Sequence, residues 1–545
     1  MPYNSLMQFW GFYLACPVIL WLLFRVIFTP FPSYSQHDKK SLSVNNRADA
    51  IPAIVVHDEW FKATRASLRQ LTQGMNTLLS GYNQYSRNGL PFIVHEPSFQ
   101  QEILLPPEHI KWFSSQPDSK MSSRTIREER HAVGYLHVGV EFDSTLFFLE
   151  RIIRDSLTRN LDTIQGPMRE EIVRQFDQMF EADGVASDEW RTIKVYDSFQ
   201  KLILPVMTRV FFGLPLSRDV SFLKSFERYM LAMGVGTIVI GELPKFLKSL
   251  FVPLFNLPLR YYRSTTLHKL VPEVEQQLSE SDGRSQEVSF VSQCARVSAK
   301  SANLSSAKDP QILAEWLMLA GFAAMSSTVI QISNSLLDIL HCDSELGLVQ
   351  ALRDEAESVL KTEDDWSTST AFHKLVLYDS AIRESLRCHP ILIKGLTKEV
   401  IDPDGLKLPN GTLLPRGSWV GVPVVGIHRD ERFYPKSSTY DPYRFLKLKL
   451  DVEKNASGDQ RTTTSEYDAA RPGVEYLGFG YGRHACPGRW FAVLMMKTLL
   501  AHLLLRYDVE ATTPPPKTSV IGDAALPPLS SSIRVRRRNV VPSQH

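Results

Sequence analysis

The ten residues Phe479-Gly480-Tyr481-Gly482-Arg483-His484-Ala485-Cys486-Pro487-Gly488 hold one cysteine in a turn that is rich in glycine. Glycine tolerates positive φ and lets the backbone approach a flat ligand closely, so Gly480, Gly482 and Gly488 favour a tight loop. The apolar residues from 490 to 505 predict a long helix directly after the loop. Free amide groups and the macrodipole at the start of such a helix stabilise a thiolate. Cys486 is therefore the first candidate for a functional residue.

Two other interpretations of this loop have to be weighed. A lone cysteine is usually a buried structural thiol, because free cysteine is among the most buried residue types. The glycines at 478, 480 and 482 could also cradle a phosphate group. The dinucleotide-binding fingerprint, however, needs a further glycine after two residues, and no Lys-Ser or Lys-Thr pair follows as in a P-loop. A phosphate loop is therefore disfavoured.

The pattern Phe479-x-x-Gly482-x-His484-x-Cys486-x-Gly488 resembles the haem-binding signature of the cytochrome P-450 monooxygenases. The resemblance implies that Cys486 is the axial thiolate ligand of haem iron, where thiolate donation favours cleavage of the O–O bond. It further implies that Phe479 packs against the sulfur loop and that His484 contacts a haem propionate. Five matched positions at fixed spacing outweigh the interpretation of Cys486 as a structural thiol.

Two acid and base motifs precede the loop in the order that this family shows. Glu384-Ser-Leu-Arg387 lies in a helix predicted over 372–389, although an acid and a base three residues apart usually mark only a solvated helix face. Arg444 follows in the segment Tyr440-Asp-Pro-Tyr-Arg-Phe445. The resemblance implies that Glu384, Arg387 and Arg444 form a buried three-way salt bridge beneath the haem loop. Their expected role is structural, because the loss of one partner would leave a buried charge uncompensated.

A long helix is predicted from Gln311 to His341, because Asp309-Pro310 is a helix start signal and no proline or turn cluster follows. At 1.5 Å per residue it would be about 45 Å long and would cross the whole core. The resemblance implies that this helix crosses over the haem. There the family usually carries an acid followed by an alcohol, and the two relay protons to the bound dioxygen.

Three hydroxyl residues occupy the proton-relay positions of this helix. Aligned on Ala323 and Ala324, Ser326 stands at the position of the acid and Ser327 at that of the alcohol, with Thr328 next. A serine hydroxyl can relay a proton but supplies no titrating carboxylate. We expect Ser327 or Thr328 to assist proton delivery, with Ser326 the third candidate. In a helix such side chains can instead bond back to the carbonyl four residues earlier.

Composition favours one large enzymatic domain. The 545 residues carry 61 basic and 59 acidic side chains, so the net charge of +2 argues against a nucleic-acid binder. Five cysteines without a C-x-x-C pair fit free thiols in a reducing compartment. Alternating strand and turn signals occur at 401–425. We expect a mainly α domain with a small β region over 51–545, which is the cytochrome P-450 fold if the resemblance holds.

The amino-terminal segment predicts a membrane anchor. Residues 9–28 are almost continuously apolar and long enough to cross a bilayer core of about 30 Å. A signal peptide is disfavoured, since no basic residue precedes the run and no small-residue cleavage site follows it. The basic residues after the run place the remaining chain in the cytosol. We therefore expect an anchor at 1–29, a linker at 30–50 and a single-pass protein of the endoplasmic reticulum membrane.

Two short stretches resemble a narrower group. Residues 111–118 (KWFSSQPD) and 157–161 (LTRNL) are similar to stretches of fungal microsomal members that act on diterpenes, such as ent-kaurene oxidases. The resemblance implies a haem-dependent monooxygenase that oxidises a hydrophobic small molecule, a terpenoid or related secondary metabolite, with O2. No flavin or nicotinamide motif is found, so electrons would come from a separate NADPH-dependent reductase.

Two alternatives remain open at this point. The first is a haem-thiolate enzyme that catalyses a rearrangement or a dehydration without inserting oxygen, and the serine at position 326 in place of an acid favours it. The second is a haem carrier or sensor without enzymatic activity. Labelled dioxygen separates the first alternative from a monooxygenase, because only a monooxygenase transfers the label to its product.

Overall fold

The computed structural model describes residues 51–54, 62–136, 150–180, 189–279, 289–300, 308–455, 464–514, 519–526 and 529–538. The predicted membrane anchor (1–29) and linker (30–50) lie outside these residues. In the described part the fold is mostly helical with several small sheets, which confirms the predicted fold class at that level.

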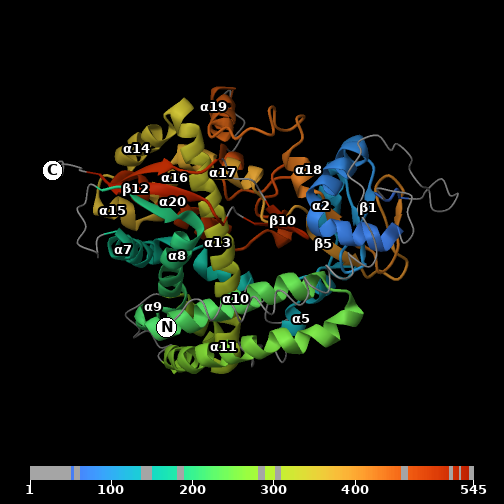
Figure 1. The fold of residues 1–545 in the computed structure, drawn as a ribbon, viewed down its shortest axis with the longest axis horizontal. Helices are drawn as coiled ribbons and strands as arrows, with labels where there is room; N and C mark the ends of the chain where they lie inside the picture. The colour runs from blue at the N-terminus through green and yellow to red at the C-terminus, as the bar shows by residue number, and fades with distance from the viewer. Residues whose placement is uncertain are drawn as a thin grey trace.

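Helices surround one central rod (Figure 1). The longer α-helices are α2 (Lys62–Gln84), α7 (Leu161–Phe180), α8 (Val195–Phe212), α10 (Val220–Glu242), α11 (Lys245–Ser279), α12 (Phe290–Lys300), α13 (Pro310–Leu346), α14 (Leu348–Val359), α17 (Val376–Cys388), α19 (Arg444–Asn455) and α20 (Arg489–Arg506). The short α-helices are α3 (Ile110–Ser115), α4 (Arg124–Glu129), α5 (Val133–Leu136), α9 (Leu214–Arg218), α15 (Glu363–Ser367), α16 (Ser369–His373) and α18 (Val424–His428). The 3-10 and π turns are η1 (Ser86–Asn88), η2 (Pro107–His109), η3 (Ile153–Leu157), η5 (Thr464–Tyr467) and η6 (Gly482–His484).

The strands form four small sheets. The largest has the order β1-β2-β8-β5-β3, in which β2 and β8 are parallel and the other pairs are antiparallel. A second sheet has the order β4-β12-β9, and two hairpins join β6 to β7 and β10 to β11. The strands are β1 (Phe92–His95), β2 (Gln101–Leu104), β3 (Met121–Ser122), β4 (Arg191–Lys194), β5 (Gly395–Val400), β6 (Leu406–Lys407), β7 (Leu413–Leu414), β8 (Trp419–Val422), β9 (Tyr507–Ala511), β10 (Ser519–Ile521), β11 (Ala524–Leu526) and β12 (Ser532–Arg537).

The central rod is α13, which contains the whole predicted range 311–341 and so confirms that prediction. The Asp309 carboxylate caps it by accepting hydrogen bonds from the amides of Gln311 and Ile312, and Gly347 ends it with φ +58°. Among the described helices α13 alone is long and apolar enough to cross a membrane. It packs against α8, α11, α17 and α20, so its apolar surface belongs to the protein core.

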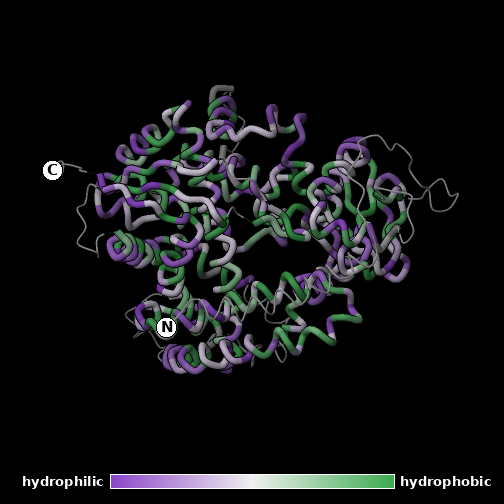
Figure 2. Tube along the Cα trace, viewed as in Figure 1, coloured by the Kyte–Doolittle hydropathy of each residue, from purple (hydrophilic) through white to green (hydrophobic). Residues whose placement is uncertain are grey.

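The antiparallel pair α10 and α11 covers one end of α13 (Figure 1). A Cβ on Gly321 of α13 would lie 2.9 Å from the Phe226 ring of α10, so glycine permits this close approach. Figure 2 shows hydrophobic and hydrophilic segments alternating along both helices, as expected for amphipathic helices.

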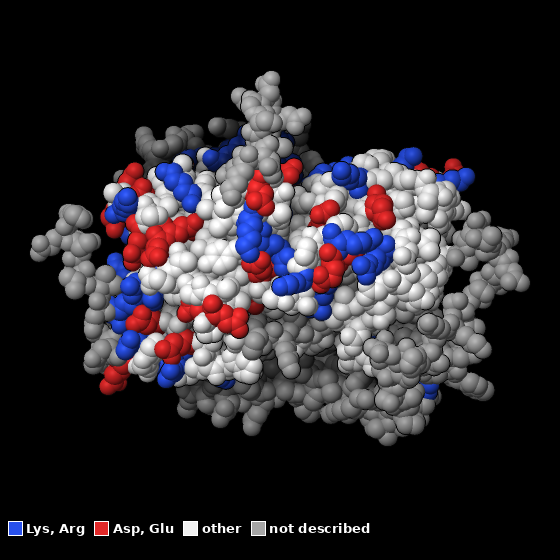
Figure 3. Space-filling model, turned by 90° about the horizontal axis from the view of Figure 1, so that it is seen from above, with Lys and Arg blue, Asp and Glu red and all other residues white. Residues whose placement is uncertain are grey.

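The β region at 401–425 differs in one detail from the prediction that it consists of strands and turns. β8 ends at Val422, and residues 424–428 form the short helix α18 instead of continuing the strand. Pro423 stands at the junction and provides no backbone N–H for a sheet ladder. Figure 3 shows basic and acidic side chains interspersed over the face that it draws, in keeping with the near-zero net charge.

Candidate active site

The loop before α20 places Cys486 at the amino terminus of that helix. The Cys486 amide donates to the Phe479 carbonyl oxygen at 2.8 Å, which closes the loop into a hairpin. Gly480 and Gly482 have φ +75° and +71°, values that strain other residues. The amides of Gly488 and Arg489 then point at the Cys486 sulfur. The glycines thus make the tight turn that the sequence predicted.

Burial raises the pKa of the Cys486 thiol above its ordinary value, while the hydrogen bond from the Gly488 amide, the Arg489 charge and the Arg489 amide lower it in part. Without a further cation the sulfur therefore stays protonated at neutral pH. These three groups nevertheless favour a thiolate once a metal ion binds, because thiolate is the ligating form of cysteine. The arrangement suits a metal ligand better than a free nucleophile.

A cavity of about 480 Å³ lies between the Cys486 loop and α13. This volume falls in the range of about 300–1,000 Å³ that is usual for small-molecule and cofactor sites. Small residues of α13 form one wall, and apolar residues of α20, α8 and the segment before β5 form the others. The lining includes Phe211, Leu319, Ala320, Ala323, Ala324, Ile391, Leu392, Leu396, Phe479, Cys486, Phe491 and Met496. Every residue from 391 to 396 except Ile393 lines the cavity.

The structure separates the three hydroxyl residues of α13. Ser327 and Thr328 line the cavity, whereas Ser326 is not among the lining residues. Each of the three hydroxyls donates to the carbonyl oxygen four residues earlier, at 2.9, 2.7 and 2.7 Å respectively. The backbone bonding that the sequence left open therefore occurs at all three. Of the three, Ser327 and Thr328 have their side chains beside the space where a bound ligand would sit.

The acid and base motifs meet in a buried cluster. Arg387 donates to both oxygens of Glu384, at 2.8 and 2.7 Å, and Arg444 donates from Nε to Glu384 Oε1 at 2.9 Å. Both arginines also bond backbone carbonyl oxygens, including those of His428 and Pro435. Two guanidinium groups thus share one carboxylate that is fully inaccessible to solvent. The cluster ties α17 to the segment that leads to the Cys486 loop.

A second cavity of about 300 Å³ shares Gly480 and Leu396 with the first and is lined by Lys398 and His484. The Lys398 ammonium is buried, and no described residue accepts a hydrogen bond from it. Burial lowers the pKa of Lys398 to about 8, with a smaller contribution from Arg483. His484 Nε2 accepts from Arg483 Nε at 3.0 Å and lies 3.3 Å from an Asp118 oxygen. A buried cation that makes no hydrogen bond or ion pair with any described residue therefore stands next to the sulfur loop.

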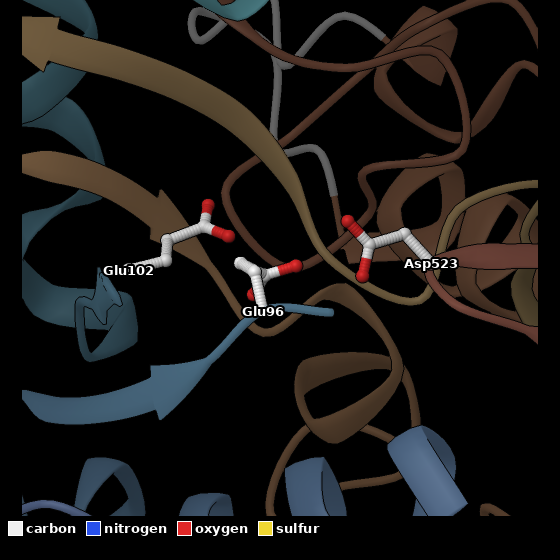
Figure 4. A group of neighbouring side chains, drawn as sticks. All are labelled: Glu96, Glu102 and Asp523. Carbon is white, nitrogen blue, oxygen red and sulfur yellow. The ribbon is translucent and has the colours of Figure 1, made fainter. Parts of the chain in front are cut away.

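Three carboxylates, from Glu96, Glu102 and Asp523, lie close together (Figure 4), and of the three only Asp523 lines the second cavity. Such a set could hold a metal ion, but the Lys394 ammonium already lies among them, 2.8 Å from Glu102 and 3.0 Å from Asp523, and it is paired with Glu96. Arg130 adds a contact of 2.6 Å to Glu102. The two cations offset two of the three carboxylate charges, and burial raises the pKa of Glu96 to about 7, which reduces the remaining negative charge. It joins the β1–β2 turn to the β10–β11 turn.

Comparison with known proteins agrees with this architecture. The family model described as Cytochrome P-450 matches residues 147–534, which is more than half of the chain. The chain belongs to the cytochrome P-450 family. It is 50% identical over 491 residues to the cytochrome P-450 monooxygenase efuH of Hormonema carpetanum, covering 89% of this chain and 86% of that one. It is 49% identical over 510 residues to the monooxygenase fsoD of Humicola fuscoatra, covering 90% and 93%.

A more distant relative spans nearly the full length. The cytochrome P-450 monooxygenase polB of Polytolypa hystricis is 35% identical over 544 residues, which cover 97% of this chain and 99% of that one. These similarities make this chain an enzyme of the P-450 monooxygenase type. Members of this family use haem, and the usual arrangement draws electrons from NADPH through a separate reductase.

The residues of the site fit a haem group. The sulfur faces the cavity from a helix amino terminus, and small side chains at Ala323 and Ala324 leave space opposite it. A haem carries carboxylate groups at its edge, and one of these could pair with the Lys398 ammonium, which has no hydrogen-bond partner among the described residues. An orphaned buried cation in a cytochrome P-450 is thus explained by a ligand that supplies the missing anion.

Two residues of this site, Lys398 and Gln331, were not identified from the sequence. Lys398 follows His389-Pro390 by eight residues in a strand, and nothing in the sequence shows that it lacks an acidic partner. Gln331 lines the first cavity one turn after Ser327. The spacing of four from Ser327 is the signal that could have identified Gln331, because residues four apart share one face of a helix.

Proposed function

We propose that this cytochrome P-450 inserts one oxygen atom into a hydrophobic small molecule, a terpenoid or related fungal secondary metabolite. The observation that carries the proposal is the placement of Cys486 at the wall of an apolar cavity, opposite the small residues of α13. The apolar lining supports a hydrophobic substrate, since little in it would pair with a charged one. The terpenoid class rests on the short stretches at 111–118 and 157–161.

In this proposal Cys486 binds the haem iron as a thiolate. The amides of Gly488 and Arg489 hold the sulfur in its ionised form through hydrogen bonds. Lys398 and His484 hold the two propionate groups, and Phe479 covers the sulfur loop. Gly482 permits the turn that brings His484 to its place, since a Cβ there would lie 3.1 Å from Ser114 Cβ. When bound, the haem supplies the activation of dioxygen.

The chain itself provides proton delivery and exclusion of water. Ser327 and Thr328 stand at the cavity wall and can pass a proton when their hydroxyls turn away from the backbone carbonyl oxygens that they bond at rest. Ser326 is the weakest of the three candidates, because its side chain is not part of the cavity wall. Glu384, Arg387 and Arg444 fix the base of the loop and touch no ligand.

We further propose that the enzyme works at the cytosolic face of the endoplasmic reticulum membrane, with the segment 1–29 as its anchor. A row of exposed apolar side chains on α11 supports membrane contact. Phe246, Leu250, Leu257 and Tyr261 recur at helical spacing and expose 64 to 71% of their surface. Exposed apolar rows of this kind mark interaction surfaces, and an interfacial helix buries such a face in lipid. The partner that supplies electrons is an NADPH-dependent reductase.

The test is spectroscopic first and chemical second. The reduced protein should give the red-shifted carbon monoxide band of a thiolate-bound haem, and Cys486→Ala should lose it. A Cys486→Ala protein that keeps the band would refute the assignment. Incubation of candidate terpenoids under labelled dioxygen should then place one labelled atom in the product. An unlabelled product would favour rearrangement or dehydration, the second candidate that the serine at position 326 supports.

A further inference from the structure

Gln331 of α13 lines the active-site cavity and carries a polar atom that has no hydrogen-bond partner among the residues that the structure describes. Its side chain is buried, and its Nε2 donates to the His389 carbonyl oxygen at 3.0 Å. This bond fixes the orientation of the amide group, because Nε2 must face His389. The opposite atom, Oε1, accepts no hydrogen bond from any described residue. A buried carbonyl oxygen without a donor costs about 1–3 kcal/mol, so an unseen donor is expected there.

The position of Gln331 along the helix makes Ser327 its neighbour. Residues four apart on a helix have Cβ atoms about 5–6 Å from one another. Two hydrogen bonds of about 2.8 Å, made by one bridging water, span the same distance. Ser327 already donates its proton to the Ala323 carbonyl oxygen, so its lone pairs remain free to accept from a water. The pair can therefore hold one water at the cavity wall.

Further buried polar side chains follow Gln331 along α13. Asn334 and Ser335 follow on the same side of α13, and Asn334 Oδ1 and Ser335 Oγ also have no partner among the described residues. Asp338 comes one turn later, where its two oxygens contact His389 Nε2 at 3.1 Å and Ser385 Oγ at 2.6 Å. In an otherwise apolar core helix this buried stripe is unusual, and partly unsatisfied polar groups of this kind commonly bind water. The stripe leads from the cavity to a carboxyl group.

We propose that Gln331 is a positioning residue for proton delivery, holding a water against Ser327 in place of the carboxylic acid that position 326 lacks. This inference rests on the proposed function. The water donates one hydrogen to Gln331 Oε1, which aligns the other hydrogen with Ser327 and the cavity. With a haem bound, the Ser327 hydroxyl would deliver a proton into the cavity and take one from this water, and the polar stripe would return a proton to the water.

The consequence can be measured without knowing the substrate. One NADPH and one proton reduce dioxygen to hydrogen peroxide, whereas two NADPH and two protons carry it to two waters. The hydrogen peroxide released per NADPH therefore falls as proton delivery improves. The full-length enzyme, reconstituted with an NADPH-dependent reductase, gives this ratio directly.

The decisive variants are Gln331→Leu and Gln331→Glu. The first removes the acceptor, and the second keeps an oxygen at the same distance along the side chain, while its carboxyl group, which burial keeps protonated, can donate to the His389 carbonyl oxygen in place of Nε2. We expect Gln331→Leu to slow water formation by about tenfold, less than the 10²–10⁴-fold typical of a direct proton donor, because Ser327 and Thr328 remain. Peroxide per NADPH and the solvent deuterium isotope effect on NADPH consumption should rise, and Gln331→Glu should stay near the wild type. The infrared band of bound carbon monoxide should shift in Gln331→Leu, since it reports the polar groups near the ligand.

Gln165 provides a matched control. It is fully buried in α7, its Nε2 donates to the Trp366 carbonyl oxygen at 3.1 Å, and its Oε1 also lacks a partner, but it does not line the cavity. Gln165→Leu should therefore leave the peroxide ratio and the carbon monoxide band unchanged. Equal changes in Gln165→Leu and Gln331→Leu, or in Gln331→Leu and Gln331→Glu, would make Gln331 a packing residue and overturn the inference.

The same experiment distinguishes a failure of the proposed function from a failure of the role of Gln331. A wild-type protein without the thiolate-haem band would refute the proposed function. A wild-type protein with that band, beside a Gln331→Leu variant with an unchanged peroxide ratio and an unchanged carbon monoxide band, would refute only the role of Gln331.

Discussion

Replacement of Lys398 by methionine should have opposite effects on the haem-free and the haem-bound protein. In the haem-free fold the ammonium is buried beside the Phe113 ring, 5.4 Å from its centroid, without a hydrogen-bond partner. Burial lowers the pKa of Lys398 from 10.5 to about 8, and this difference corresponds to about 3 kcal/mol. At pH 7 the Lys398→Met variant should therefore unfold with a free energy about 3 kcal/mol higher than the wild type.

The sign of the pH dependence follows from linkage. The pKa of Lys398 is lower in the folded than in the unfolded state, so the unfolded chain binds the proton more tightly. The wild-type penalty is complete below pH 8 and fades as the pH rises from 8 towards 10.5. Urea unfolding of the haem-free proteins at pH 7 and at pH 10 should show the advantage of Lys398→Met shrinking. Lys407→Met, at an exposed lysine of β6, should change stability by less than about 0.5 kcal/mol.

The haem-bound protein should behave in the opposite way. A hydrogen bond to a charged group contributes about 1.5–3 kcal/mol, so loss of the Lys398 contact to a propionate should speed haem transfer to apomyoglobin by about 10- to 100-fold. The wild-type advantage should decline when the pH rises far enough to deprotonate Lys398. A Lys398→Met protein that is no more stable without haem and loses haem at the wild-type rate would refute the reasoning on both counts.

Three further predictions concern other parts of the chain. Glu384→Gln should lower the free energy of unfolding by about 3–5 kcal/mol, because Arg387 and Arg444 then share no buried counter-charge. An unchanged melting temperature would contradict the role of the cluster. Ser327→Ala should raise the hydrogen peroxide released per NADPH, and an unchanged ratio would remove Ser327 from proton delivery. In a chain without residues 1–50, Leu250→Asp should weaken binding to phospholipid vesicles by about tenfold or more, and equal sedimentation with vesicles would argue against membrane contact by α11.

Predictions from the sequence succeeded where the signal is local. The absence of proline and of turn clusters after Asp309-Pro310 predicted α13. In the structure this helix ends at Leu346, before Gly347, a residue that readily takes the left-handed conformation. The glycine spacing around Cys486 predicted a tight turn, and the positive φ values of Gly480 and Gly482 show it. In both cases each residue prefers the conformation that its neighbours also require.

The sequence could not show which residues lack partners. Lys398 is informative because no acid in the described part of the chain pairs with it, and that depends on residues far away in the sequence. The same holds for Gln331 Oε1. Spacing alone favoured Ser327 and Thr328 but kept Ser326 as a third candidate. Successive helix residues point about 100° apart, so only the packing of α13 decides which of them faces the cavity.

The ionic cluster at Lys394 has a consequence for the time course of biosynthesis. Glu96 and Lys394 are 298 positions apart, so at 5–20 residues per second roughly 15 to 60 s pass between their addition to the nascent chain. Asp523, the last member, is added later still. Until Lys394 is added, the acidic groups of the β1–β2 hairpin have only Arg130 as a cation of the cluster, and the acid left without a partner favours hydration over burial. Burial of the three acids together with both of their cations is therefore complete only after the chain has been synthesised as far as Asp523.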